Sequence, residues 1–175
     1  SVQMIKSGTI GQPRTACIRL QCNWGPWANS DLCTVDHLTP WYVDVLNRML
    51  DALPKRVLVL DGHGTSGRSQ NQSIGVFDYG DVWGMFQINI ASVIDLETTI
   101  EVNGDDGDLI TNVFTGEIRL RSRKSSDWSV EQVGFIQPKA GWPGMHECVW
   151  AFLDAVESSK PSLMNATTVA QLHLV

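Results

Sequence analysis

The chain has 175 residues, of which 43% are hydrophobic and 18% are charged, and its formal net charge is −6. This length predicts a single domain over residues 1–175 with a sizeable core. A net negative charge argues against a general nucleic-acid binder, whose surface would be basic. No stretch approaches the roughly 20 apolar residues that cross a bilayer, so no membrane partner is expected.

The first element in chain order is a strand at Arg14–Cys22, where apolar and polar residues alternate. A period of two is typical of a strand with one buried face. The following stretch, Asn23–Leu38, is irregular and carries Trp24 and Trp27. We expect these two tryptophans to anchor a long loop.

A helix is predicted over residues 40–53. Thr39 and Pro40 supply a cap and a first-turn proline, and Pro54 ends the helix. The apolar residues recur at helical spacing and share one face. They are Trp41, Val45, Met49 and Leu53.

Short alternating segments separated by turn residues follow this helix, and each predicts a strand. They are Arg56–Leu60, Ser73–Tyr79, Val82–Ala91, Ile94–Val102, Leu109–Phe114, Glu117–Arg123 and Trp128–Ile136. A second amphipathic helix is predicted over residues 144–157, and a last strand at Thr168–Val175. Strands that follow one another with short turns favour a mainly β fold, an antiparallel β-sandwich or jelly roll with two short helices.

The glycine-rich segment Leu60–Gly67 ends a predicted strand and contains His63. It resembles the histidine segment of subtilases, in which the histidine is a general base. One reading is therefore a small hydrolase that uses His63 with Asp61 and Ser66. No matching nucleophile segment follows, so we favour a loop without catalysis, and no catalytic residue is predicted.

Three arginines, Arg119, Arg121 and Arg123, alternate along one predicted strand. Such a row could bind phosphate groups. We favour a solvated strand face that Glu97 and Glu101 balance from a nearby strand.

The remaining polar clusters predict no metal site and no cofactor. The turn Asn103–Asp108 is rich in Asp and Gly, which a tight hairpin favours for backbone reasons, and it does not fit a calcium loop. The four cysteines, Cys17, Cys22, Cys33 and Cys148, lack zinc-ligand spacing. We interpret them as scattered, mostly buried thiols.

Three segments together resemble the jelly-roll coat proteins of picorna-like viruses, of the comovirus and nepovirus type. They are Ser7–Leu20, the helix Pro40–Leu53, and Gly75–Gly84 with its D-Y-G sequence. The resemblance implies a structural coat subunit that is not an enzyme, acts by self-assembly and resides in the virion. It also implies release from a precursor, which would explain the absence of an initial Met.

In this interpretation the partners are other copies of the chain or sister coat subunits, and weakly viral RNA. The candidate interface residues are Trp24, Trp27, His63, Arg119, Arg121 and Arg123. The alternatives are the hydrolase based on His63 and a glycan- or receptor-binding β-sandwich.

Overall fold

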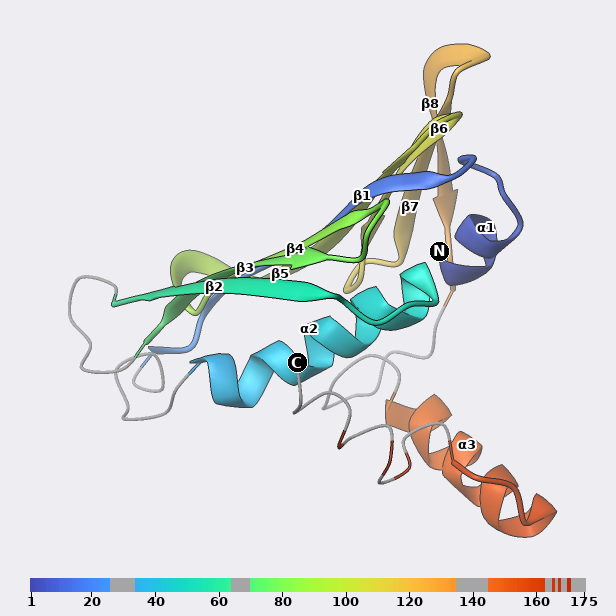
Figure 1. The fold of residues 1–175 in the computed structure, drawn as a ribbon. Coiled ribbons are helices and arrows are strands. Elements are labelled where there is room, and N and C mark those ends of the chain that lie inside the picture. Colours follow the sequence, from blue (N-terminus) through green and yellow to red (C-terminus); the bar gives the residue numbers. More distant parts are fainter. Residues whose placement is uncertain are drawn as a thin grey trace. The chain divides into compact units, whose positions relative to one another are not determined.

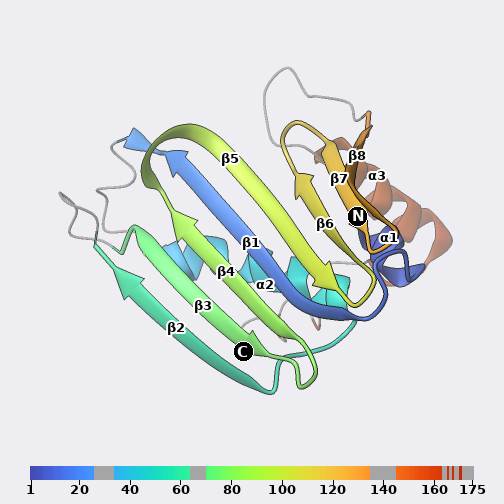
Figure 2. The ribbon, with the colours of Figure 1, turned by 90° about the horizontal axis from the view of Figure 1, so that it is seen from above.

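The computed structural model describes residues 1–25, 34–63, 70–134 and 145–162, together with 165, 167 and 170. Its strands form one eight-stranded sheet in the order β2-β3-β4-β1-β5-β6-β7-β8 (Figures 1 and 2). The strands are β1 (Pro13–Asn23), β2 (Arg56–Gly62), β3 (Gln72–Asp78), β4 (Trp83–Asn89), β5 (Ala91–Gly104), β6 (Gly107–Asn112), β7 (Glu117–Ser122) and β8 (Ser125–Gln132). The helices are α1 (Val2–Lys6), α2 (Thr34–Leu50) and α3 (Met145–Ser158).

The centre of the sheet holds its one parallel pair among the described residues, β1 beside β4. Every other neighbouring pair is antiparallel. Because β4, β3 and β2 alternate in direction, β2 runs parallel to β1 although two strands lie between them. Parallel strands need a long crossover connection, and α2 lies in the connection from β1 to β2.

The hydrophobic core lies between α2 and one face of the sheet. Along β1 the buried residues are Ala16, Ile18, Leu20 and Cys22, as their alternation predicts. Phe77 and Phe86 pack beside them with ring centroids 5.5 Å apart. From α2, Val43, Leu46 and Met49 are buried, and the helix contacts β1, β3 and β4. Figure 1 shows α2 along this single face.

The predicted sandwich or jelly roll is wrong. The described strands belong to one sheet, and its covered face is covered by a helix rather than by a second sheet. Alternation with period two shows that one side of a strand is buried, but it carries no information about the layer that buries it. The parallel pair also departs from the purely antiparallel arrangement that we predicted.

The predicted helix over residues 40–53 exists, but its bounds were wrong, and its predicted apolar face was right at Met49 and wrong at Trp41 and Leu53. It begins at Thr34, so Thr39 and Pro40 do not cap it, and Pro40 lies inside it. Its last turn is followed by Asp51 with a φ of 51°, where the helix has ended. Trp41 is 66% exposed, whereas Val43 is buried. A proline after Thr fits a first turn equally well, so the residues alone did not locate the start.

Residues 1–132 form one compact unit and residues 133–175 another. This division does not show whether either unit folds on its own. The single domain predicted over residues 1–175 therefore stays a prediction. In the second unit α3 confirms the predicted second helix within one residue at each end. Its apolar side chains are exposed, among them Trp150 and Phe152.

No described helix is long and apolar enough to span a membrane. The predicted strand Thr168–Val175 falls almost wholly outside the described residues.

Gly75 of β3 provides a test of the core. A Cβ at this position would lie 2.4 Å from a ring carbon of Phe86. We expect Gly75→Ala to lower the free energy of unfolding by about 1–3 kcal/mol, because the extra methyl overpacks the core. Urea unfolding measures this loss. Gly62→Ala is the control, since its Cβ would meet nothing closer than 3.9 Å, and an equal loss in both variants would contradict the packing.

Candidate functional site

The face of the sheet opposite α2 is called the open face. The strand register places one residue of each strand in a continuous row across it. One such row is Leu58, Val76, Met85, Cys17, Glu101, Ile110, Arg119 and Val130. The row is apolar at β2, β3 and β4, and it carries charged residues at β5 and β7. The two halves of the open face are therefore chemically different.

The apolar half is formed by five side chains of three neighbouring strands, which we call the apolar patch. They are Leu58, Leu60, Ile74, Val76 and Met85. Leu58 and Leu60 are 60% and 62% exposed, and Ile74 is 49% exposed. None of the five carries a charge. Large apolar side chains exposed together mark binding surfaces in folded proteins.

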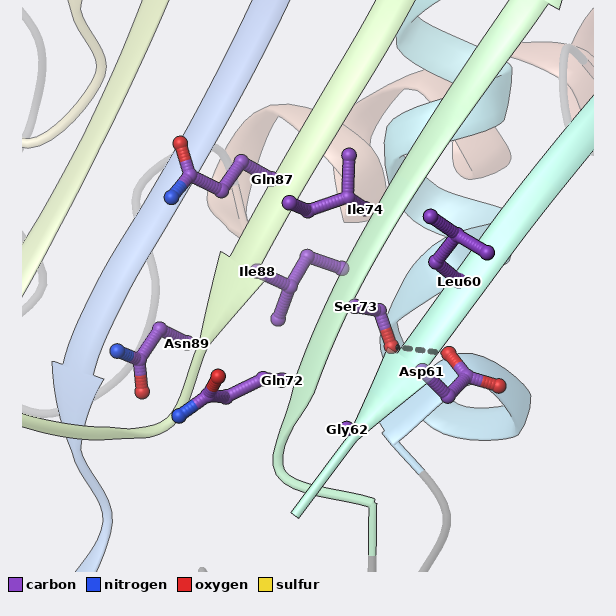
Figure 3. Close-up of a pocket in the computed structure, with 9 residues that line it drawn as sticks. All are labelled: Leu60, Asp61, Gly62, Gln72, Ser73, Ile74, Gln87, Ile88 and Asn89. Atoms are coloured by element: carbon purple, nitrogen blue, oxygen red, sulfur yellow. Dashed lines mark hydrogen bonds between the residues drawn. The ribbon is translucent and has the colours of Figure 1, made fainter. Parts of the chain in front are cut away.

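A hollow of about 230 Å³ adjoins the apolar patch where β2 and β4 end and β3 begins (Figure 3). Three amides of the open face contribute to its lining, Gln72, Gln87 and Asn89. Asp61 and Ser73 also belong to the lining, but the register places their side chains on the face toward α2, in the row of Ile88 and Leu20. Leu60 of the apolar patch belongs to the lining as well. An amide both donates and accepts hydrogen bonds. The amides therefore suit a small ligand rich in hydroxyl groups.

Hydrogen bonds link the strands around the hollow. On the α2 side of the sheet, the Oγ of Ser73 donates to Oδ1 of Asp61 at 2.7 Å (Figure 3). The Nε of Arg19 donates to Oε1 of Gln87 at 3.2 Å. Beside them the backbone N–H of Asn71 donates to the carbonyl of Gly62 at 3.1 Å. A site whose side chains are already fixed loses less conformational entropy when a ligand binds.

The hydrolase arrangement predicted around His63 receives no support. Asp61 is engaged by Ser73, and His63 is an exposed residue directly after β2. Ser66 lies outside the described residues, as does Trp27. Trp24 is half-buried, and its backbone N–H donates to the carbonyl of Ile90 at 3.1 Å. Its role as an interface residue stays a prediction, as do those of His63 and Trp27.

The row of arginines is engaged by carboxylates other than those predicted. The Nε of Arg119 donates to Glu117 at 2.6 Å. Arg121 bonds Asp108 through both Nε and Nη2, and its guanidinium lies 4.9 Å from the ring centroid of Trp128. Arg123 lies in the turn after β7. Glu97 and Glu101 lie on β5, two strands away from β7.

The thiols show no sign of nucleophilic chemistry. Cys17 is half-buried, Cys22 is buried and Cys148 is exposed, and all three are free. Burial raises the pKa of Cys22 to about 11, so its thiol stays protonated near neutral pH. Cys33 lies outside the described residues. Among the described residues no group of three His, Cys, Asp or Glu side chains could hold a metal ion.

The glycine spacing directly after β2 is a signal of a dinucleotide-binding loop. Residues 62–67, Gly-His-Gly-Thr-Ser-Gly, fit the G-x-G-x-x-G pattern directly after a strand. In dinucleotide-binding proteins that pattern opens a helix leading to a parallel strand. Here the chain passes from β2 into the antiparallel neighbour β3, which begins at Gln72. The surrounding topology therefore does not match that of a dinucleotide loop.

Comparison with solved structures places this fold among oxidoreductases. An oxidoreductase from Agrobacterium radiobacter, solved with NAD⁺, L-tartaric acid and magnesium, matches 98% of this chain with a TM-score of 0.79 and 11% identity. UDP-N-acetylglucosamine 3-dehydrogenase from Acidithiobacillus ferrooxidans matches 98% with a TM-score of 0.78 and 12% identity. An inositol dehydrogenase homologue from Azotobacter vinelandii, solved with NADH and myo-inositol, matches 99% with a TM-score of 0.74 and 13% identity.

These identities establish a shared fold and no more. The chain spans 56%, 54% and 55% of the length of the three proteins, little more than half in each case. No protein-family model matches the sequence, and no curated protein matches it.

The shared fold overturns the coat-protein interpretation. The structures that match are oxidoreductases and dehydrogenases, not jelly-roll shell subunits. The predicted capsid function, the non-enzymatic assignment and the virion location are therefore wrong, and the fold is one found in enzymes. The segments Ser7–Leu20 and Gly75–Gly84 resembled coat-protein strands because short alternating strands look alike in unrelated sheets. Partnership with other copies, and weakly with RNA, stays a prediction.

The pKa of Asp108 tests whether Arg121 is held at the surface. A hydrogen bond from Asn103 and then the bond from Arg121 lower this pKa below its ordinary value. We expect Arg121→Gln to raise the pKa of Asp108 but leave it below that value, because Asn103 remains. An NMR titration of the carboxyl carbons measures the change. Arg123→Gln is the control and should leave Asp108 unchanged; a shift in the control alone would contradict the pairing.

Proposed function

We propose that this chain forms the substrate-side sheet of an oxidoreductase that acts on a small polyhydroxylated compound. The shared fold supports an oxidoreductase. The hollow beside the apolar patch supports the substrate class, and it is the observation on which the proposal rests. Its amides match hydroxyl groups, which donate and accept hydrogen bonds in the same way.

The ligands and substrates of the matching proteins agree with this chemistry. Tartaric acid, UDP-N-acetylglucosamine, levoglucosan and myo-inositol all carry several hydroxyl groups. The hollow has a volume of about 230 Å³. Pockets for drug-sized ligands measure roughly 300–1,000 Å³, so the hollow suits the smaller of these compounds. A single sugar ring or a polyol is therefore the preferred ligand.

The described residues do not fit the nicotinamide dinucleotide found with several of these proteins. A dinucleotide fold has a parallel sheet with helices on both faces, whereas this sheet has one parallel pair and one open face. The glycine-rich residues 62–67 connect antiparallel strands. In our proposal the dinucleotide is held outside the described residues, and this sheet positions the substrate.

Within the hollow, the amides of the open face have the main part in that positioning. Gln87 is fixed through Arg19, and the two strands β3 and β4 present Gln72 and Asn89 at paired positions. Leu60 and Ile74 provide an apolar side for the C–H surface of a sugar ring.

Binding of myo-inositol, levoglucosan and UDP-N-acetylglucosamine tests this proposal. We expect at least one of the three to shift the side-chain amide signals of Gln72, Gln87 and Asn89 in NMR spectra. Gln87→Ala should weaken that binding several-fold, because a hydrogen bond between neutral groups contributes roughly 0.5–1.5 kcal/mol.

The matched control is Gln132→Ala, which removes an exposed amide of β8. It should leave the affinity unchanged. If none of the three compounds shifts the amides, or if both variants weaken binding equally, the proposed substrate site is wrong.

A further inference from the structure

We propose that the ligand of the hollow is a sugar acid, a polyhydroxylated compound that carries one carboxylate, and that Arg19 binds this carboxylate. The inference rests on the proposed function, since it names the substrate class of the same site. It goes further because it makes one charged group of the ligand, in addition to the hydroxyl groups, a feature that the site selects.

Arg19 lies on the open face directly beside the hollow. The strand register places it in one row with Gln87, Ile74 and Leu60, across β1, β4, β3 and β2. These three residues line the hollow (Figure 3), and Arg19 is exposed on the next strand. Neighbouring strands are about 4.8 Å apart. A ligand of one sugar ring that contacts Gln87 can therefore reach Arg19 as well.

The order of the groups along this row matches the groups of a sugar acid. Leu60 and Ile74 offer apolar surface to the C–H groups of a ring. Gln87 offers an amide to its hydroxyl groups, and Arg19 offers a cation to a carboxylate. A neutral polyol would use the first three residues of the row and leave the charge of the fourth without an opposite charge.

The hydrogen bonding of Arg19 differs from that of the other arginines. Five described arginines form ion pairs with carboxylates, and they are Arg14, Arg48, Arg56, Arg119 and Arg121. Arg123 is attracted electrostatically to Asp105. Arg19 instead donates its Nε–H to the neutral amide oxygen of Gln87 at 3.2 Å. Within the described part of the chain it forms no ion pair.

The bond to Gln87 prepares Arg19 for a carboxylate. A guanidinium has five N–H donors in one plane, and this bond occupies the donor on Nε. The two Nη groups keep donors whose spacing matches the two oxygens of a carboxylate. Because the side chain is already held by Gln87, less conformational entropy is lost when the ligand binds.

Two carboxylates on the neighbouring strand limit the charge of the ligand. Arg19 is opposite Thr99 of β5, and Glu97 and Glu101 lie two residues to either side of Thr99 on the same face. One guanidinium neutralises a single negative charge. A phosphate monoester carries about −1.5 to −2 and would keep part of its charge beside these two glutamates, where like charges repel. We therefore favour a single carboxylate over a sugar phosphate.

Titration with D-glucuronate and D-glucose tests the proposal, because glucuronate has a carboxylate where glucose has a CH2OH group. We expect glucuronate to bind the full chain at least about five-fold more tightly, as a charge-assisted pair of hydrogen bonds would produce. The NMR shifts of the side-chain amides of Gln72, Gln87 and Asn89 measure both affinities. Glucose 6-phosphate should bind more weakly than glucuronate. Equal affinities for glucuronate and glucose, or tighter binding of the phosphate, would overturn the proposal.

Substitution of Arg19 tests whether this residue recognises the carboxylate. Arg19→Gln should bring the ratio of the two affinities to about one, because the cation is lost. Arg19→Lys should keep part of the preference, since it retains the charge without the planar group. Arg119→Gln is the matched control, because it removes the same charge from the same face at β7, and it should keep the full preference. Equal loss in Arg19→Gln and Arg119→Gln would contradict a specific contact with Arg19.

The neutral probes separate this proposal from the proposed function. If myo-inositol, levoglucosan or glucose shifts the amides and glucuronate binds no better, the sugar acid is wrong and the proposed function stands. If glucuronate binds more tightly and the preference depends on Arg19, both are supported. If neither the neutral probes nor glucuronate shifts the amides, the hollow binds no polyhydroxylated ligand and both are wrong.

Discussion

The structure depends on the fact that one helix covers one face of one sheet. Alpha-helix α2 buries Val43, Leu46 and Met49 against β1, β3 and β4, and the covered face supplies the core. The opposite face is then free to carry residues that a core would exclude, such as Arg19 and Gln87. The open face can therefore carry the apolar patch on one half and charged residues on the other, because α2 does not pack against it.

The local elements could be predicted from the sequence because their physical causes are local. Alternation at Arg14–Cys22 located β1 within a residue at each end, and the Asp- and Gly-rich turn at residues 103–108 correctly indicated the hairpin between β5 and β6. The layer that covers the strands could not be predicted in this way. A helix and a second sheet impose the same period of two on the strand beneath them, so Ile18 and Leu20 are consistent with either.

The candidate site was missed for a related reason. Asp61 was singled out as the partner of His63, its close neighbour in sequence, but its hydrogen-bond partner is Ser73 on the adjacent strand. Gln72 and Asn89 are opposite each other only through the register of β3 and β4, which no local pattern specifies. The glycine spacing of residues 62–67 was a signal of a different kind. The spacing indicates a dinucleotide-binding loop only where a helix follows the strand. Here an antiparallel strand follows, and the spacing alone does not distinguish the two cases.

The position of β1 has a consequence for how the chain reaches this structure. β1 separates a run of three strands, β2 to β4, from a run of four, β5 to β8, and it pairs with both. Arg19 and Gln87, joined across β1 and β4, are 68 residues apart in the chain. Closing so long a loop is entropically costly and slows folding. Each run can form from strands that are neighbours along the chain. The two runs join into one sheet only when β1 pairs with β4 on one side and with β5 on the other.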